Sequence, residues 1–132
     1  MSQVHELQQL LKNFGAAFNR HDADALISMM TPDCLFRTAM GATAGGTLVS
    51  GHAAVKKAFQ DTFAAFPDAQ WVSRGADLVL ETRGLSEWTF IGTRASDGAR
   101  IEADGVDVFT FRDGLIAIKD AYRKDRPPLA KA

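Results

Sequence analysis

One acidic and one basic residue lie on the two halves of an apolar hairpin near the end of the chain. The segment D-V-F-T-F-R-D-G-L-I-A-I-K-D runs from Asp107 to Asp120, and its apolar halves flank a turn at 112–114. A three-residue turn would pair Asp107 with Lys119 on one face of two antiparallel strands. A charge pair among aromatic residues is either a solvated edge of the sheet or the polar part of a pocket.

In a pocket, this pair could carry out proton transfer. Asp107 could act as a general acid or base, or as a hydrogen-bond donor to a substrate oxyanion if it is protonated. Lys119 could orient that carboxyl group or bind an anionic group of the substrate. The alternative is structural, with Asp107 as an ion-paired carboxylate and Lys119 as a charge that extends into solvent. Asp107 and Lys119 are therefore the candidate catalytic residues.

The other residues that could do chemistry lie in less favourable patterns. Cys34 is the single cysteine, so an internal disulfide is excluded, and no histidine stands beside it as a base. The three histidines, His5, His21 and His52, lack metal-ligand spacing. The sequence therefore predicts no metal site and no other cofactor.

The composition is that of one globular domain, which we expect to span residues 1–132. Hydrophobic residues make up 46% and charged residues 23%, with a formal net charge of -1. No basic block interleaved with aromatic residues predicts a nucleic-acid surface, and no basic amphipathic helix or long apolar run predicts a membrane interaction. The first residues do not resemble a signal peptide, which makes a cytoplasmic location the expectation.

Helical periodicity dominates the first half of the chain. Apolar residues recur on one stripe from Val4 to Phe18. Asp22 is a good N-cap for a second helix that carries Met29 and Met30 and stops at Thr31-Pro32. The helices are thus predicted at approximately 4–18, 22–30 and 51–66.

Period-two patterns dominate the second half, with turns at glycines. They predict four strands at approximately 70–80, 84–94, 100–111 and 115–124, preceded by a short strand at 34–39. Helices followed by a strand meander indicate an α+β fold. A strongly bent sheet around three helices would form a cone with a concave apolar cavity. The Gly-rich loop from Met40 to Ser50 is either a mobile lid or a flexible connection.

The order of these elements carries a resemblance. With the motifs A-F-N-R-H-D-A-D-A-L-I-S-M-M-T-P-D-C-L-F, S-G-H-A-A-V-K-K-A-F, A-F-P-D, W-T-F-I-G-T and D-V-F-T-F-R-D-G-L-I, the chain resembles the NTF2-like superfamily. Within it, the chain is most similar to the SnoaL-like polyketide cyclases and ketosteroid isomerases. The resemblance covers nearly the whole chain and implies three N-terminal helices packed on a strongly curved, mainly antiparallel sheet. It also implies a cone-shaped pocket and a dimer, but the superfamily holds many unrelated activities.

Individual positions separate these activities. The stretch D-V-F-T-F matches the isomerase segment that carries the oxyanion-binding Asp, which falls on Asp107. The positions of the isomerase tyrosine and base hold Phe14 and Thr38, so steroid isomerisation is not expected. The position of the acid in the SnoaL-like cyclases and epoxide-hydrolase relatives holds Ala121, and the position of their histidine holds Arg94. The chain therefore lacks both residues that the resemblance to these two activities would imply.

The inward-facing stripes of helices and strands predict the lining of the cavity. The expected ligand is a small apolar organic molecule, although the same aromatic residues could simply be core. If the chain is an enzyme, we expect a cofactor-independent lyase, isomerase or cyclase; the alternative is a non-catalytic ligand-binding or accessory protein. The predicted ligand-binding residues are Phe14, Phe18, Met30, Phe36, Thr38, Phe59, Phe63, Trp88, Phe90 and Phe109.

A homodimer is the expected assembly. Trp71, Val79 and Tyr122 are interpreted as apolar residues on the outer face of the sheet, which one layer of helices cannot cover. A second copy would bury that face.

Overall fold

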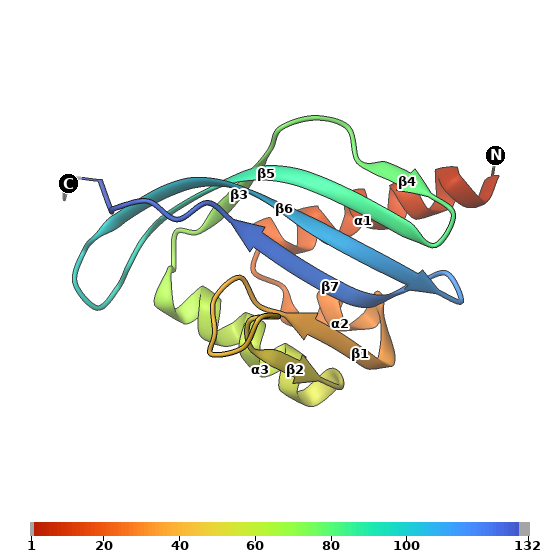
Figure 1. The fold of residues 1–132 in the computed structure, drawn as a ribbon, viewed down its shortest axis with the longest axis horizontal. Helices are drawn as coiled ribbons and strands as arrows, with labels where there is room; N and C mark the ends of the chain where they lie inside the picture. The colour runs from red at the N-terminus through yellow and green to blue at the C-terminus, as the bar shows by residue number, and fades with distance from the viewer. Residues whose placement is uncertain (1, 130–132) are drawn as a thin grey trace.

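Three helices cover one face of a seven-stranded sheet in the computed structural model, which describes residues 2–129 (Figure 1). All neighbouring strands are antiparallel except one central parallel pair, β1 with β7. The strand order is β2-β1-β7-β6-β5-β3, with β4 also paired to β5. The elements are α1 (Ser2–Asn19), α2 (Ala23–Ser28), β1 (Met30–Arg37), β2 (Leu48–Ser50), α3 (His52–Ala65), β3 (Gln70–Ser73), β4 (Leu78–Leu80), β5 (Arg83–Thr93), β6 (Arg100–Arg112) and β7 (Leu115–Arg123).

The predicted α+β fold with three N-terminal helices on a curved sheet is confirmed. The apolar stripe of α1 is buried at Leu7, Leu11, Phe14, Ala17 and Phe18, as its periodicity requires, while Val4 near the start of the helix is exposed. Asp22 caps α2 by accepting a hydrogen bond from the backbone N–H of Ala25 at 3.0 Å. Among the described residues, no helix combines the length and apolarity that a membrane span needs.

The second helix is shorter than predicted. It ends at Ser28, and Met30 is the first residue of β1, where it pairs with Ile116 of β7. Pro32 disfavours helical backbone at the residue before it, and the parallel pairing with β7 takes up the preceding residues as strand. Met30 therefore lies in the sheet and not in a helix.

The strand predictions differ from the structure in two places. The segment predicted as one strand at 70–80 is two strands, β3 and β4, separated by the connection at 74–77. The short strand β2 lies at the end of the Gly-rich segment that the sequence predicted as a loop. It has only three residues, two of them exposed, so it carries no readable alternation.

The register of the last hairpin also differs from the prediction. Its turn has two central residues, Asp113 and Gly114, both with positive φ (55° and 76°), as the favoured two-residue hairpin turns require. A register shift follows and leaves Ala117 without a partner in the ladder. Asp107 is therefore opposite Ala121 and not opposite Lys119.

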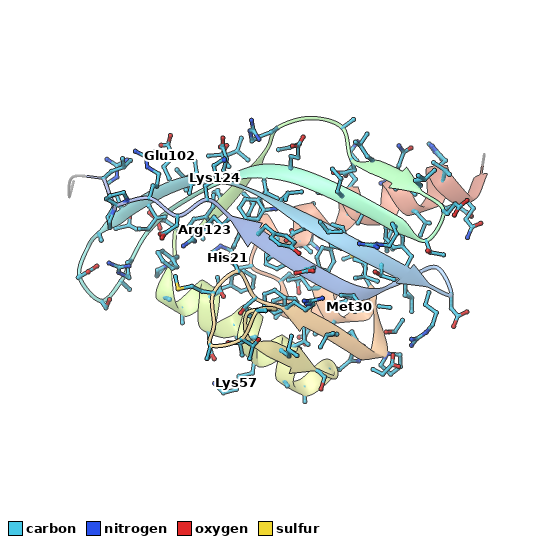
Figure 2. The ribbon with its side chains drawn as sticks, in the orientation of Figure 1. His21, Met30, Lys57, Glu102, Arg123 and Lys124 are labelled. Atoms are coloured by element: carbon cyan, nitrogen blue, oxygen red, sulfur yellow. The ribbon has the colours of Figure 1, made fainter. Side chains whose placement is uncertain are left out.

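The core lies between the helices and the inner face of the sheet. Figure 2 shows side chains filling this space, with Met30 and His21 among them. Met30 is 1% exposed, and the ring of His21 stacks on Phe63 at a centroid distance of 4.3 Å. A second, smaller cluster of buried residues consists of Ala69, Trp88, Phe90 and Ile101.

Two residues expected on the outer face of the sheet lie inside. Trp71 packs in edge-to-face and tilted contacts with Phe18 and Phe90, at centroid distances of 5.0 Å and 5.2 Å, and Val79 packs against the main core. Only Tyr122 of the three is exposed, at 54%. The outer face still has apolar side chains, because the residues that alternate with the inward positions include Val72, Leu78, Leu80 and Ile91.

Candidate functional site

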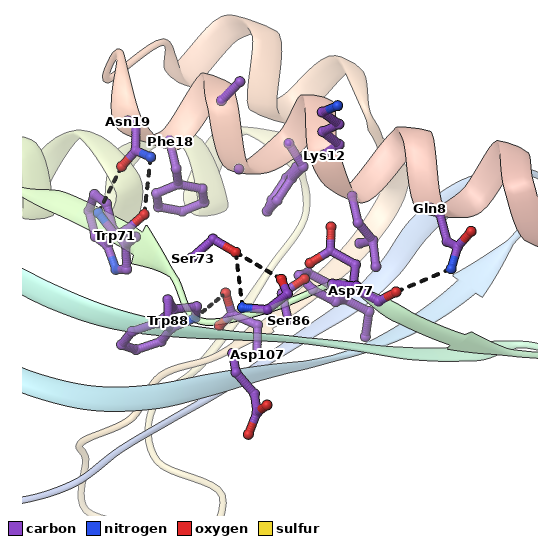
Figure 3. A pocket seen from close by; sticks show the side chains of 18 of the residues that line it. Gln8, Lys12, Phe18, Asn19, Trp71, Ser73, Asp77, Ser86, Trp88 and Asp107 are labelled. Carbon is purple, nitrogen blue, oxygen red and sulfur yellow. Dashed lines mark hydrogen bonds between the residues drawn. The ribbon is translucent and has the colours of Figure 1, made fainter.

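A cavity of about 540 Å³ lies between α1 and the inner face of the sheet. Figure 3 shows α1 forming one wall and the sheet, with the connection from β3 to β4, forming the other. Its volume is in the usual range for a small-molecule site. Six of the residues predicted from the sequence line it: Phe14, Phe18, Trp88, Asp107, Phe109 and Lys119.

Asp107 and Lys119 form a buried ion pair at the floor of this cavity. The Lys119 ammonium donates a hydrogen bond to Oδ1 of Asp107 at 2.9 Å. The side chains are 11% (Asp107) and 7% (Lys119) exposed. The expected contact is present although the residues are not opposed, because they are diagonal neighbours on the same inward face of β6 and β7.

Trp88 completes the surroundings of the carboxylate. Its indole Nε1–H donates a hydrogen bond to Oδ2 of Asp107 at 3.1 Å, so each carboxylate oxygen has one donor. Gly105 makes this orientation possible, since a Cβ there would overlap the Trp88 ring from the neighbouring strand. The glycine thus lets the indole lie flat across β6 and aim its N–H at Asp107.

The Lys119 ammonium is otherwise surrounded by aromatic rings. It lies 5.0 Å from the ring centroid of Phe18 and 4.7 Å from that of Phe36. Such contacts favour a cation over an apolar surface. Among the described residues Asp107 is its one hydrogen-bonding partner, so Lys119 has donors to spare for a ligand oxygen.

Ser86 adds a hydroxyl group to the same floor. It pairs with Asp107 across β5 and β6 and lines the cavity. The arrangement can therefore accept a proton at Asp107, donate a hydrogen bond from Lys119 and offer a neutral hydroxyl beside them. These are the groups that general acid–base chemistry on an organic molecule needs.

The entrance side of the cavity was not predicted from the sequence. One stripe of α1, at positions 8, 12, 15 and 19, faces the segment 73–77. Gln8 donates to the carbonyl oxygen of Asp77 at 3.2 Å. The side-chain amide of Asn19 donates to the carbonyl oxygen of Trp71 at 3.1 Å and accepts from the backbone N–H of Trp71 at 2.7 Å. The one available signal was the row of polar and small residues beside the apolar stripe of α1.

The remaining predicted ligand residues lie outside the cavity lining. Met30, Phe59 and Phe63 are buried in the main core, and Phe90 is in the smaller cluster. Their role as ligand contacts stays a prediction, as does that of Phe36, which lies behind the Lys119 ammonium.

Thr38 lies away from the cavity, at the start of the Gly-rich loop. Its hydroxyl donates to the carbonyl oxygen of Met40 at 2.6 Å and accepts from the N–H of Thr47 at 2.9 Å. These bonds close the base of the loop. Thr38 therefore serves the loop conformation in this structure.

The other chemistry-bearing residues have structural surroundings. Cys34 is fully buried, and burial raises the pKa of its thiol. The ring nitrogens Nε2 of His21 and His52 lie 2.8 Å and 2.9 Å from the carbonyl oxygens of Ala69 and Met30. Within residues 2–129, no three His, Cys, Asp or Glu side chains gather closely enough to hold a metal ion.

Arg123 extends the inward face of β7 beyond Lys119. Its guanidinium lies 5.3 Å from the ring centroid of Phe90, and burial lowers its pKa. It does not line the cavity.

A family model and several solved structures are similar to this chain. The model of the SnoaL-like domain matches residues 11–118. A proposed polyketide cyclase from Xanthomonas campestris pv. campestris has a TM-score of 0.80 at 21% identity, over 92% of this chain and 93% of that one. TerC, co-crystallised with polyporic acid, has a TM-score of 0.76 at 21% identity, over 90% and 92%.

A third similar structure is a Catenulispora acidiphila protein with a ketosteroid isomerase-like fold, in complex with trimethylamine. Its TM-score is 0.75 at 13% identity, over 86% of this chain and 83% of that one. No curated protein matches the chain. At these identities the solved structures establish the NTF2-like fold alone.

Proposed function

We propose that this chain, which belongs to the SnoaL-like domain family of the NTF2-like superfamily, catalyses cofactor-independent proton transfer on a small, mainly apolar organic molecule. One observation carries the proposal. A buried carboxylate, held by an ammonium and an indole N–H, lies on the floor of a cavity beside the aromatic rings of Phe14, Phe18 and Phe109. Burying such charges is unfavourable for a fold, and a reaction that uses them would explain why they are there.

The proposed chemistry begins with Asp107 as a general base. Its carboxylate would take a proton from a carbon next to a substrate carbonyl, and the C–H electron pair would pass into the enolate. The Lys119 ammonium would donate a hydrogen bond to the enolate oxygen, where the negative charge develops. Return of the proton to another atom gives isomerisation, expulsion of a β-substituent gives elimination, and attack on a second carbonyl of the same molecule gives cyclisation.

This chemistry defines the ligand class. A ketone would place the carbon that loses its proton at Asp107 and its oxygen at Lys119, and a hydroxyl group beside the carbonyl would offer the floor a further hydrogen bond. The rings of Phe14, Phe18 and Phe109 offer flat apolar walls, which suit a planar ring system. The similar structure of TerC was obtained with polyporic acid, and an organic ligand of this kind supports the proposal by analogy only.

The second candidate is a ligand-binding or accessory protein without catalysis. The observation that favours it is the loss of two chemical groups of the isomerases, whose positions hold Phe14 and Thr38. Thr38 also lies outside the cavity. A protein that only binds would keep the pocket and use Asp107 and Lys119 to orient its ligand.

One assay separates the two candidates. The probe is 2′-hydroxyacetophenone, whose acetyl protons exchange with deuterium when a base abstracts them. We expect faster exchange in D₂O with the wild-type protein, and loss of the acceleration in Asp107→Asn with binding retained. Binding without accelerated exchange favours the non-catalytic candidate, and no binding of this or larger hydroxyaryl ketones refutes the proposal.

Binding itself can be followed without a label. The chain has two tryptophans, Trp71 and Trp88, and both line the cavity. A ligand in the cavity should quench their fluorescence saturably. A tryptophan signal that does not saturate would indicate nonspecific association.

A further inference from the structure

A glycine in the interior of α1 is not explained by the fold. Gly15 is helical and lies four residues before the end of α1 at Asn19. Glycine is less stable than alanine inside a helix, because it loses more backbone freedom on folding. Its φ is not among the positive values of the chain, and a Cβ built on it meets no heavy atom within 4 Å. Neither backbone geometry nor packing requires glycine here.

The space in front of Gly15 belongs to the cavity. Gly15 lines it together with Ala16, and the facing segment contributes Ser73, Gly75 and Ala76. All five have small side chains or none, while the floor has large aromatic ones. The cavity is therefore lined by small residues between Gly15 and positions 73–76, with the longer side chain of Lys12 three residues earlier on α1.

Hydrogen bonds fix the two ends of this gap. At one end, Gln8 of α1 hydrogen-bonds the carbonyl oxygen of Asp77. At the other end, Asn19 hydrogen-bonds the backbone carbonyl and N–H groups of Trp71. Figure 3 shows both sets of bonds linking the helix to the opposite wall. Between them, no hydrogen bond joins α1 to positions 73–76 within the described residues. The gap is thus held open at a set width.

From these observations we infer that Gly15 determines which ligands the site accepts. The bare helix backbone leaves room for a flat ligand whose polar end lies at Asp107 and Lys119 and whose body extends out past α1. The ligand class is a fused-ring molecule with adjacent hydroxyl and carbonyl groups at one end, longer than a single ring. This inference rests on the proposed function, because it uses the same floor residues as the anchor of the ligand.

The test compares three probes that share one polar end and differ in length. They are 2′-hydroxyacetophenone, 1-hydroxy-2-acetonaphthone and 1-hydroxyanthraquinone, with one, two and three rings. Their Kd values are measured by quenching of the two tryptophans in wild type, Gly15→Ala and Gly15→Leu. We expect Gly15→Leu to raise the Kd of the three-ring probe about tenfold or more and that of the one-ring probe less than about twofold.

Gly15→Ala provides a second test in case the leucine side chain of Gly15→Leu disturbs α1. It should raise Tm by roughly 2–6 °C through helix propensity and still weaken the three-ring probe by about threefold. The matched control is Asn13→Ala. Asn13 is exposed on α1, and its amide oxygen accepts a hydrogen bond from the side-chain amide of Gln9 at 2.9 Å. This substitution also raises helix propensity, and it should leave all three Kd values unchanged.

The outcomes separate this inference from the proposed function. If all probes bind wild type but neither Gly15 variant changes the three-ring Kd, the inference is overturned and the proposed function stands. An equal rise for all three probes, in Gly15→Ala as well, would also overturn it, since length would not matter. If no probe binds wild type, both fall.

Discussion

Removing the Lys119 ammonium should leave a buried carboxylate with half of its partners. In Lys119→Met, Asp107 keeps only the indole N–H of Trp88 at 3.1 Å. Removing one partner of a buried pair costs roughly 3–5 kcal/mol, because the remaining charge stays desolvated. Methionine has a similar length and apolar body, so little of this cost comes from an empty cavity.

The lower end of that range applies here. Trp88 still stabilises the carboxylate, and the side chain of Asp107 is 11% exposed. We therefore expect a loss of about 3 kcal/mol, which for a chain of this size lowers Tm by roughly 10–15 °C. Asp107→Asn retains an acceptor for Lys119 and should cost less, about 1–2 kcal/mol.

Urea unfolding at pH 7 measures these free energies directly. The matched control is Lys57→Met, which breaks the 3.1 Å pair of Lys57 with Asp61, whose side chains are 74% (Lys57) and 64% (Asp61) exposed. That exposed pair should contribute at most about 0.5 kcal/mol. Lys119→Met combined with Asp107→Leu, which removes both charges, should recover much of the loss. If Lys119→Met costs no more than Lys57→Met, the buried-pair reasoning is refuted.

We also propose that the protein is a homodimer in which the outer face of the sheet buries about 1,000 Å² or more. Tyr122→Arg should then shift the equilibrium towards the monomer. A wild-type protein that is monomeric by light scattering at micromolar concentration would contradict this proposal. Cys34 should react slowly with iodoacetamide in the native state, because it is fully buried with a raised thiol pKa, and rapidly in urea; equal rates would show that the thiol is accessible. A bond from the backbone N–H of Thr93 at 2.7 Å lowers the pKa of Asp68, so its contribution to stability is present above about pH 4 and is lost as pH falls through the folded-state pKa. Asp68→Asn should therefore lose less stability than wild type between pH 7 and pH 3 in urea unfolding, and identical losses would count against this role.

The predicted contact of Asp107 with Lys119 is correct although the predicted register is wrong. The real turn is one residue shorter than predicted, which alone would put the two side chains on opposite faces of the sheet. The bulge at Ala117 adds one residue and returns Lys119 to the inward face. Together the two deviations shift the pairing by two residues, which keeps both side chains on the same face but makes them diagonal neighbours. The pattern of alternation therefore predicted the face, while the pairing could not be read.

The first helix and the start of the second could be predicted because their signals are local, whereas the family could be predicted from the order of the motifs along nearly the whole chain. The apolar stripe of α1 and the cap at Asp22 each lie within a few turns of chain. The entrance of the cavity could not be predicted, since it depends on how α1 meets the segment 73–77, more than 50 residues away. Trp71 was misplaced for the same kind of reason, because its pairing with the buried Phe90 of β5 decides which face of the sheet it lies on.

The central claim is that an organic molecule binds on the floor formed by Asp107, Lys119 and Trp88. The most direct measurement follows the two indole N–H signals in ¹H–¹⁵N NMR spectra during titration with 1-hydroxy-2-acetonaphthone. Because the Trp88 indole is bonded to Asp107 and the Trp71 ring lies at the edge of the cavity, both signals should shift saturably. The Trp88 shift should be reduced in Asp107→Asn. Unchanged indole signals, with shifts confined to backbone amides of the outer sheet face, would contradict the claim.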